Sequence, residues 1–285
     1  MKPASLCRRR PCLTVLLAAS FWVAGCRSPQ FRAQPAEANT ATPDFGAAGE
    51  AIRRDPVAYL RQVRRRCLAL SKYRLTFYRQ ERLGLFGTLG KMEKIAVKYR
   101  AEPLSIKFEW NDPDSYLYES VYVAGANDDK VVLRERHGWL GFPPTIRRIG
   151  TTDSVKWGQS KRPITDFGLA AMMTRTLRTI DDPPLGKPAQ IRYEGVETPE
   201  PTRRPAHHFV IVRATTKESP CPRQDLWIDV ETELPCGTAL VLPDGRLDAL
   251  YVYADVEPDD SLNDADFRLS GGPTEDPAAS SMPVQ

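Results

Sequence analysis

The stretch KIAVKYRAEPLSIKFEW, residues 94–110, decides the fold class because its apolar residues fall at every second position. This alternation is typical of a β-strand with one buried and one solvated face, and it does not follow the 3.6-residue repeat of a helix. Glu102-Pro103 separates two such runs, and so short a connection predicts an antiparallel pair. The apolar members are Ile95, Val97, Tyr99, Leu104, Ile106, Phe108 and Trp110.

The same alternation continues on both sides of this stretch. Residues 73–78 (YRLTFY) precede it, and residues 115–123 (SYLYESVYV) and 130–136 (KVVLRER) follow it. Beyond an irregular segment, five more runs are typical of strands: 190–196, 207–214, 224–230, 235–242 and 249–256. About ten strands with short connections predict a long antiparallel meander, which must curl toward a barrel or be covered.

Two helices are predicted as covers. Asp55-Pro56 supplies an N-cap and a first-turn proline, and apolar residues then recur at steps of three and four to Leu70. The second helix spans residues 166–180, with Asp166 as its expected cap. The predicted fold class is therefore mainly β, with two α-helices over an antiparallel sheet.

The N-terminus is typical of an export signal. Four basic residues precede an apolar run of about a dozen residues, which is too short for a membrane span and ends in Val23-Ala24-Gly25-Cys26. These four residues resemble a bacterial lipobox, so Cys26 is expected to carry lipid; an ordinary cleaved signal or an uncleaved anchor are the alternatives. The predicted organisation is a signal peptide at 1–25, a lipidated flexible tether at 26–50, one β domain at 51–269 and a disordered tail at 270–285.

The net charge of +4 arises in this leader. Without its four basic residues the chain holds 36 basic and 36 acidic side chains. The chain after the leader therefore lacks the excess of positive charge that is typical of a nucleic-acid binder. Three cysteines follow Cys26. We expect free thiols at Cys67, Cys221 and Cys236, because a hairpin over 224–242 holds the last two too far apart for a disulfide.

Four segments carry a resemblance to known families. KMEKIAVKYRAEPLSIKFEW (91–110) and YESVYVAGAND (118–128) resemble the exported bacterial domain of unknown function 1571 (DUF1571). DLWIDVETELPCGTALVLPDG (225–245) and ADVEPDDSLNDADF (254–267) resemble, more distantly, the LolA and LolB lipoprotein-sorting proteins and related envelope sensors. The shared features are an Asp-x-x-Thr-x-x-Pro turn, here at 229–235, and an Asn-x-x-Asp-x-Phe-like phrase at 263–267.

This resemblance implies a half-open antiparallel barrel with helices over its open side and an apolar cavity that binds acyl chains. Alternation alone does not distinguish such a cavity from a filled core, so both remain open. The candidate lining residues are Leu75, Phe77, Ile95, Val97, Ile106, Phe108, Tyr116, Tyr118, Leu226 and Ile228.

The loop at residues 84–91 is the second candidate site. Its spacing does not match a phosphate-binding loop, since five residues separate Gly84 from Gly90 and Met92 stands where a Ser or Thr would hold magnesium. We interpret it as a long hairpin loop. Leu85, Phe86 and Leu89 are candidates for contact with a membrane or a partner, and packing over the barrel mouth is the alternative.

Motifs for catalysis or cofactors are not found. His207 and His208 are adjacent in a strand and therefore point to opposite faces, and no HExxH or Gly-x-Ser-x-Gly is present. The aspartates at 259–266 predict a solvated loop, with a weak calcium site as the alternative. We therefore expect no cofactor, no metal and no enzymatic activity.

Three functions remain after these exclusions. The first is a membrane-anchored envelope lipoprotein, facing the periplasm, that binds a lipid, an acyl chain or a lipoprotein. The second is an interaction or sensor module that recognises another envelope protein, and the third is an envelope hydrolase. Arg27 stands where some inner-membrane lipoproteins have Asp, which favours the outer membrane.

Overall fold

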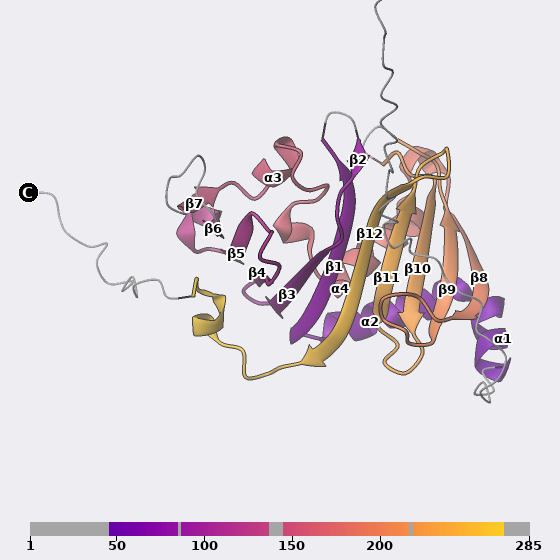
Figure 1. The fold of residues 1–285 in the computed structure, drawn as a ribbon. Helices are drawn as coiled ribbons and strands as arrows, with labels where there is room; N and C mark the ends of the chain where they lie inside the picture. The colour runs from indigo at the N-terminus through magenta and orange to yellow at the C-terminus, as the bar shows by residue number, and fades with distance from the viewer. Residues whose placement is uncertain (1–45, 85–86, 137–144, 217–218, 271–285) are drawn as a thin grey trace, which may run out of the picture. The chain divides into compact units, whose positions relative to one another are not determined.

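The computed structural model describes residues 46–84, 87–136, 145–216 and 219–270. They contain a twelve-stranded antiparallel sheet with helices on one face (Figure 1). The strands are β1 (Lys72–Leu83), β2 (Thr88–Leu89), β3 (Glu93–Arg100), β4 (Ser105–Trp110), β5 (Leu117–Val123), β6 (Val131–Glu135), β7 (Ile146–Ile149), β8 (Gln190–Glu197), β9 (Ala206–Val212), β10 (Arg223–Asp229), β11 (Pro235–Val241) and β12 (Leu247–Pro258). The α-helices are α1 (Gly46–Arg54), α2 (Pro56–Ala69), α3 (Asp153–Lys156) and α4 (Leu169–Asp181).

The sheet consists of two meanders that meet at its centre. Its order is β7-β6-β5-β4-β3-β1-β12-β11-β10-β9-β8, and the short β2 pairs with β1 outside this path. The first long strand therefore lies beside the last, with Phe77 opposite Tyr253. The edge strands β7 and β8 do not pair within the described residues, so the barrel stays open. The segment carrying α3 and α4 links these two edges.

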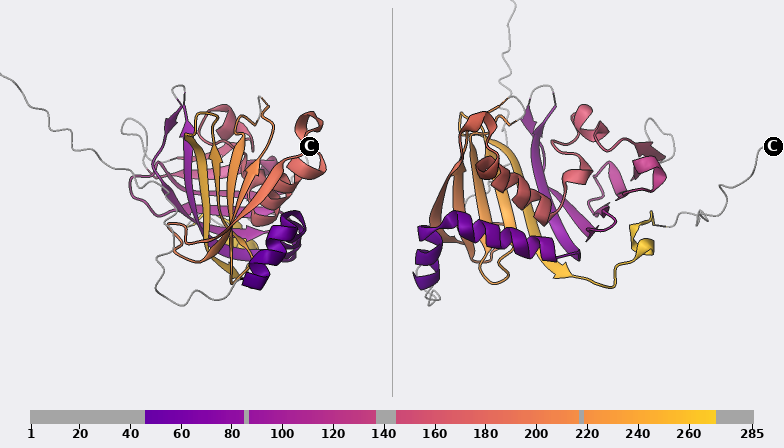
Figure 2. Two further views of the ribbon diagram at one scale, coloured as in Figure 1. Left: turned by 90° about the vertical axis from the view of Figure 1, so that its right-hand side faces the viewer. Right: turned by 180° about the vertical axis from the view of Figure 1, so that it is seen from behind.

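The helices α2 and α4 lie side by side on one face of the sheet, which we call the inner face (Figure 2). An ion pair between Arg61 and Asp181, at 2.7 Å, joins them. Both bury an apolar stripe against the inner face, and Leu60, Leu169 and Leu177 are completely buried. This burial is the main source of stability for helices of this length, which are marginal in isolation.

The start of α4 depends on a glycine. Gly168 is the N-cap residue and adopts φ 120°, a conformation that side chains rarely tolerate. A Cβ atom there would approach the Tyr99 ring to 2.9 Å. The first backbone N–H of the helix, that of Leu169, donates instead to the Tyr73 hydroxyl at 3.1 Å. This contact satisfies one of the free donors at the helix start and anchors α4 to β1 and β3.

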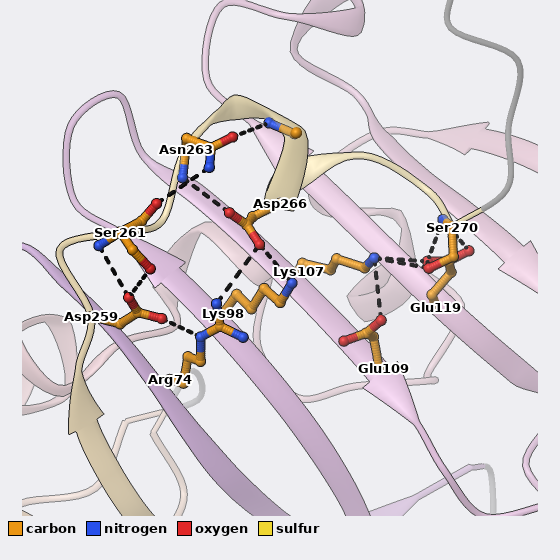
Figure 3. A network of polar contacts seen from close by, with 11 residues as sticks. Arg74, Lys98, Lys107, Glu109, Glu119, Asp259, Ser261, Asn263, Asp266 and Ser270 are labelled. Atoms are coloured by element: carbon orange, nitrogen blue, oxygen red, sulfur yellow. Dashed lines mark hydrogen bonds and ion pairs between the residues drawn. The ribbon is translucent and has the colours of Figure 1, made fainter.

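The end of the chain crosses the opposite, outer face of the sheet as a strap, residues 259–270 (Figure 3). Asn263 caps a short 3₁₀ turn, and Asp266 reaches back to the Asn263 backbone and forward to Lys98 Nζ at 2.8 Å. Phe267 is buried beneath the Arg100 guanidinium. The Asn-x-x-Asp-Phe phrase at 263–267 therefore holds the strap on the sheet, and its aspartates form ion pairs with Lys98 and Arg100.

The strap ends on a buried ion pair (Figure 3). Glu119 is fully buried and lies 3.2 Å from Lys107 Nζ. The backbone N–H of Ser270 donates to both oxygens of Glu119, at 2.9 and 3.0 Å. Ser270, assigned from the sequence to the tail, is thus bonded to the sheet.

The Asp-x-x-Thr-x-x-Pro phrase forms the turn between β10 and β11. Asp229 Oδ1 accepts hydrogen bonds from the backbone and the hydroxyl of Thr232, at 2.8 and 3.0 Å. Arg204 donates to the other oxygen at 2.7 Å. These bonds outweigh burial and lower the pKa of the Asp229 carboxyl. The role of this motif is structural.

The structure confirms the predicted mainly β class and the half-open barrel, and it corrects four details. The single long meander is two meanders, and β2, β7, α1 and α3 were not predicted. Residues 46–50, predicted as part of a flexible tether, are helical and lie in α1. Asp166 lies in a 3₁₀ turn before α4 and does not cap it.

Candidate functional site

A pocket lies between the inner face of the sheet and the segment 160–167, which we call the cover. The β1, β4, β10, β11 and β12 strands form its floor, and α4 forms one wall. Its lining residues are Phe77, Arg79, Glu81, Phe108, Ser160, Arg162, Pro163, Ile164, Asp166, Phe167, Met172, Arg175, Thr176, Arg213, Gln224, Thr238, Leu240, Tyr251 and Tyr253.

Aromatic rings form one end of the pocket. The Phe167 ring of the cover meets Phe77 and Phe108 edge-on, with centroids 5.0 and 4.9 Å apart. Tyr253 stacks on Phe77 at 5.3 Å, and burial raises the pKa of its hydroxyl to about 12. These edge-on and offset arrangements are the favourable ones for aromatic pairs. The Tyr253 hydroxyl therefore stays uncharged at physiological pH, and the aromatic side chains of this end carry no charge there.

Polar groups form the other end. The Tyr251 hydroxyl donates to Glu81 at 2.5 Å, and the Lys161 backbone N–H donates to both oxygens of Glu81 at 3.3 Å. Burial and the adjacent Glu81 carboxylate raise the pKa of Tyr251 well above its usual value. Thr238 and Thr176 both accept hydrogen bonds from the Gln224 amide at 3.1 Å.

The pocket is narrow in this conformation. The space open to the centres of water molecules is about 80 Å³, where one water needs roughly 10–15 Å³. Pockets that enclose small-molecule ligands usually measure about 300–1,000 Å³. A few waters fit as the protein stands, whereas an acyl chain requires the cover to move.

The predicted lining residues divide into three groups. Phe77 and Phe108 line the pocket. Leu75, Ile95, Val97, Ile106, Leu226 and Ile228 have exposures of 4% or less and belong to the packed core. Tyr116 and Tyr118 are 48% and 40% exposed and lie outside the pocket. They stand at the start of β5, beside the register shift between Leu117 and Glu119, where alternation does not predict burial.

Other predicted residues lie elsewhere. Leu89 is half-buried in β2, while Leu85, Phe86 and Cys26 fall outside the described residues. Sequence reasoning missed Tyr251 and Tyr253, although they alternate in a predicted strand and share a face with Phe77. It also missed the cover, whose residues show no periodicity.

The adjacent His207 and His208 occupy opposite faces of β9. His207 Nδ1 lies 2.9 Å from the Tyr193 hydroxyl of β8, and burial lowers its pKa. His208 lies between Glu197 and Asp225, at 3.0 and 2.9 Å. Burial disfavours the charged His208 ring, but these carboxylates outweigh burial and raise its pKa.

The described residues contain neither a metal-binding cluster nor a membrane-spanning helix. No group of three or more His, Cys, Asp or Glu side chains is arranged to hold a metal ion within residues 46–84, 87–136, 145–216 and 219–270. Over the same ranges, no helix has the length and the apolar character that a membrane span requires.

The fold and the pocket define a class of protein: an open antiparallel half-barrel with a narrow pocket beneath its covering segment. The family described as protein of unknown function (DUF1571) matches residues 70–274. The chain belongs to this family, as the resemblance predicted. No curated protein matches the chain.

Several solved structures are similar in fold. MucB is 15% identical over 78% of this chain and 64% of its own, with a TM-score of 0.45. The Mycobacterium tuberculosis lipoprotein LppX is 15% identical over 73% of this chain and 98% of its own, at 0.43. A putative outer membrane lipoprotein-sorting protein domain from Vibrio parahaemolyticus is 12% identical over 73% and 94%, at 0.30. At these identities the likeness concerns the fold.

Proposed function

We propose that this chain is a lipid-anchored protein of the bacterial cell envelope that binds an acyl chain, as a free lipid or as part of a lipoprotein, in the pocket beneath the cover. Cys26 carries the anchoring lipid, and residues 27–45 tether the domain to the periplasmic side of the outer membrane. The anchor rests on the lipobox-like Val23–Cys26 phrase, which lies outside the described residues.

The observation that supports binding is the amphipathic character of the pocket. Phe77, Phe108 and Phe167 form an apolar end, and charged and hydroxyl groups form the other end. Ligand sites combine mainly apolar walls with a few polar groups that fix orientation. A core without a ligand would gain no stability from the charged groups, since burying them is costly.

Binding requires the cover to move away from the inner face of the sheet. The Phe167 ring covers the stacked Phe77 and Phe108 rings, and we place a methylene chain in the position that it occupies. Lys161 joins the cover to the sheet, because its backbone N–H donates to Glu81 at 3.3 Å and its Nζ donates to Asp248 at 2.9 Å. Displacement of the cover must break these contacts, and the free energy of ligand binding has to exceed their loss.

Native mass spectrometry tests this proposal. The chain from residue 27 onward is exported with an ordinary cleaved signal and purified without detergent; we call it the unacylated chain. We expect it to retain a lipid or to take up added palmitate. Phe108→Asp should abolish this uptake, because a carboxylate in the apolar end opposes an acyl chain.

Tyr118→Asp is the matched control, since its side chain is an exposed aromatic outside the pocket. Melting curves verify that both variants fold. An apo mass in every condition would reject the lipid-binding proposal and favour recognition of another envelope protein. Labelling of Cys26 with a palmitate analogue in cells, and its loss in Cys26→Ser, tests the anchor separately.

A further inference from the structure

Three guanidinium groups line the polar end of the pocket. Arg162 belongs to the cover, Arg175 belongs to α4, and Arg213 follows β9. All three are half-buried. Each comes from a different element, so the fold and not a local sequence run brings them to one cavity.

Neutral acceptors hold two of these groups. Arg213 donates to the Cys221 carbonyl at 3.1 Å and to the Gln224 side-chain oxygen at 3.2 Å. Arg175 donates to the backbone carbonyl of Asp166 at 2.5 Å. Neither forms an ion pair with a carboxylate among the described residues. Their hydrogen bonds position the guanidinium groups without cancelling their charge.

Arg162 is the least satisfied of the three. Within the described residues, its guanidinium makes no hydrogen bond and no ion pair. Its charge acts on its neighbours: burial first, and then Arg162, lower the pKa of the Arg175 guanidinium, and both also lower that of Arg213. The fourth arginine of the lining, Arg79, is by contrast paired with Glu93 at 2.6 Å.

The carboxylates of the lining do not balance this charge. Glu81 and Asp166 are the two carboxylates of the lining, and the charge of Arg79 is balanced by Glu93 outside it. Glu81 accepts from Tyr251 and from the Lys161 backbone. Counted in full against the three arginines, these two leave one positive charge in excess. An unbalanced charge in a half-buried site indicates an anionic ligand, and guanidinium groups bind carboxylate and phosphate in a two-pronged geometry.

The polar and apolar ends are arranged in a fixed order. Along the inner face of β1, Tyr73, Leu75 and Phe77 are followed by Arg79 and Glu81. We infer that the pocket binds an amphiphile with an acidic head, whose carboxylate or phosphate contacts Arg162, Arg175 and Arg213 while its tail lies against Phe77 and Phe108. This inference rests on the proposed function and specifies the ligand.

Paired ligands that differ only in the head group test it. Palmitate and hexadecanol have the same chain length, but only palmitate is charged at pH 7.5. We expect the unacylated chain to bind palmitate roughly tenfold to a hundredfold more tightly than hexadecanol, in the range of a charge-assisted hydrogen bond. Arg162→Gln should remove most of this difference without changing the affinity for hexadecanol.

Arg175→Gln provides a second variant, and Arg192→Gln is the control, since Arg192 is exposed and pairs with Glu194 outside the pocket. A higher affinity for lysophosphatidic acid than for palmitate supports a phosphate head group, and the reverse order supports a carboxylate head group. Equal affinities for palmitate and hexadecanol would overturn the inference and leave the proposed function intact. Inorganic phosphate bound as tightly as palmitate would also overturn it, because the tail would then contribute nothing. Binding of none of these ligands would reject the proposed function itself.

Discussion

Truncation of Phe167 to alanine tests whether the space beneath the cover is a lipid pocket or a filled core. Truncation of a fully buried Phe side chain to alanine lowers the free energy of unfolding by about 3–5 kcal/mol. Phe167 is half-buried, and its two close aromatic contacts, at 5.0 and 4.9 Å, each add about 0.5–1.5 kcal/mol. We therefore expect Phe167→Ala to lower the free energy of unfolding by about 2–3 kcal/mol, at the lower end of the range for core positions.

The same change should strengthen ligand binding. Removal of the ring opens the space over Phe77 and Phe108, so an acyl chain no longer has to displace Phe167. The first measurement is urea unfolding followed by tryptophan fluorescence, in which the midpoint falls while the slope is preserved. The second is titration with a fluorescent C16 fatty acid, in which we expect the affinity to rise several-fold.

Phe267→Ala is the matched control. Phe267 is 3% exposed and belongs to the strap on the outer face, so its truncation should destabilise the fold without altering fatty-acid affinity. The reasoning is refuted if Phe167→Ala loses stability as expected but binds the fatty acid no better than the native chain. The ring would then be an ordinary core residue and its position would not be that of a ligand.

Three further predictions follow from the polar groups. Lys107→Met leaves the buried Glu119 with Arg134, at 3.4 Å, as its remaining ion-pair partner, so it should lower the free energy of unfolding by about 2 kcal/mol. Adding Glu119→Gln should recover part of this loss in a urea double-mutant cycle. His208 has a raised pKa in the folded protein, so its stabilisation is present below the unfolded value of about 6.5 and is lost as the pH rises through the folded value. The stability gap between the native chain and His208→Gln should therefore be larger at pH 5.5 than at pH 8, and an equal gap at both would contradict the assignment. Burial raises the pKa of the thiols of Cys67, Cys221 and Cys236 to about 12. These thiols should therefore resist a thiol reagent at pH 8 until urea unfolds the chain. Rapid labelling of the native chain would contradict this prediction, because it would show that the thiols are accessible.

The strands and the free thiols of Cys221 and Cys236 were both predicted from the period-two alternation of the sequence. Period-two alternation is a local property of the backbone, since successive side chains of a strand must point to opposite faces. It therefore predicted β3 and β4 from residues 94–110, and it placed Phe77 and Phe108 on the inner face. The cap at Asp55 is equally local, and its side chain accepts from the Ala58 N–H at 2.9 Å.

Positions that depend on distant segments were not predictable in this way. The helix α1 has no N-terminal acidic residue, and Gly49 and Ile52 are buried only because the helix packs beside Tyr193 of β8. The start of α4 is decided by Gly168 meeting Tyr73 and Tyr99, contacts that span some 70 to 95 residues along the chain. The sequence offered Asp166 as a good local cap, and tertiary packing selected another residue.

The sequence by itself determined the fold class, the family and the buried face of the regular strands, because these follow from local periodicity and from short motifs. Only the tertiary structure decided which inward-facing residues line a pocket. Leu226 and Phe77 alternate alike, yet Leu226 is packed in the core and Phe77 lies under the cover. The site also depends on Arg162, Arg175 and Arg213, which have no common sequence pattern. They share a cavity because the segment between β7 and β8 crosses the inner face, and long-range connections of this kind leave no period in the sequence.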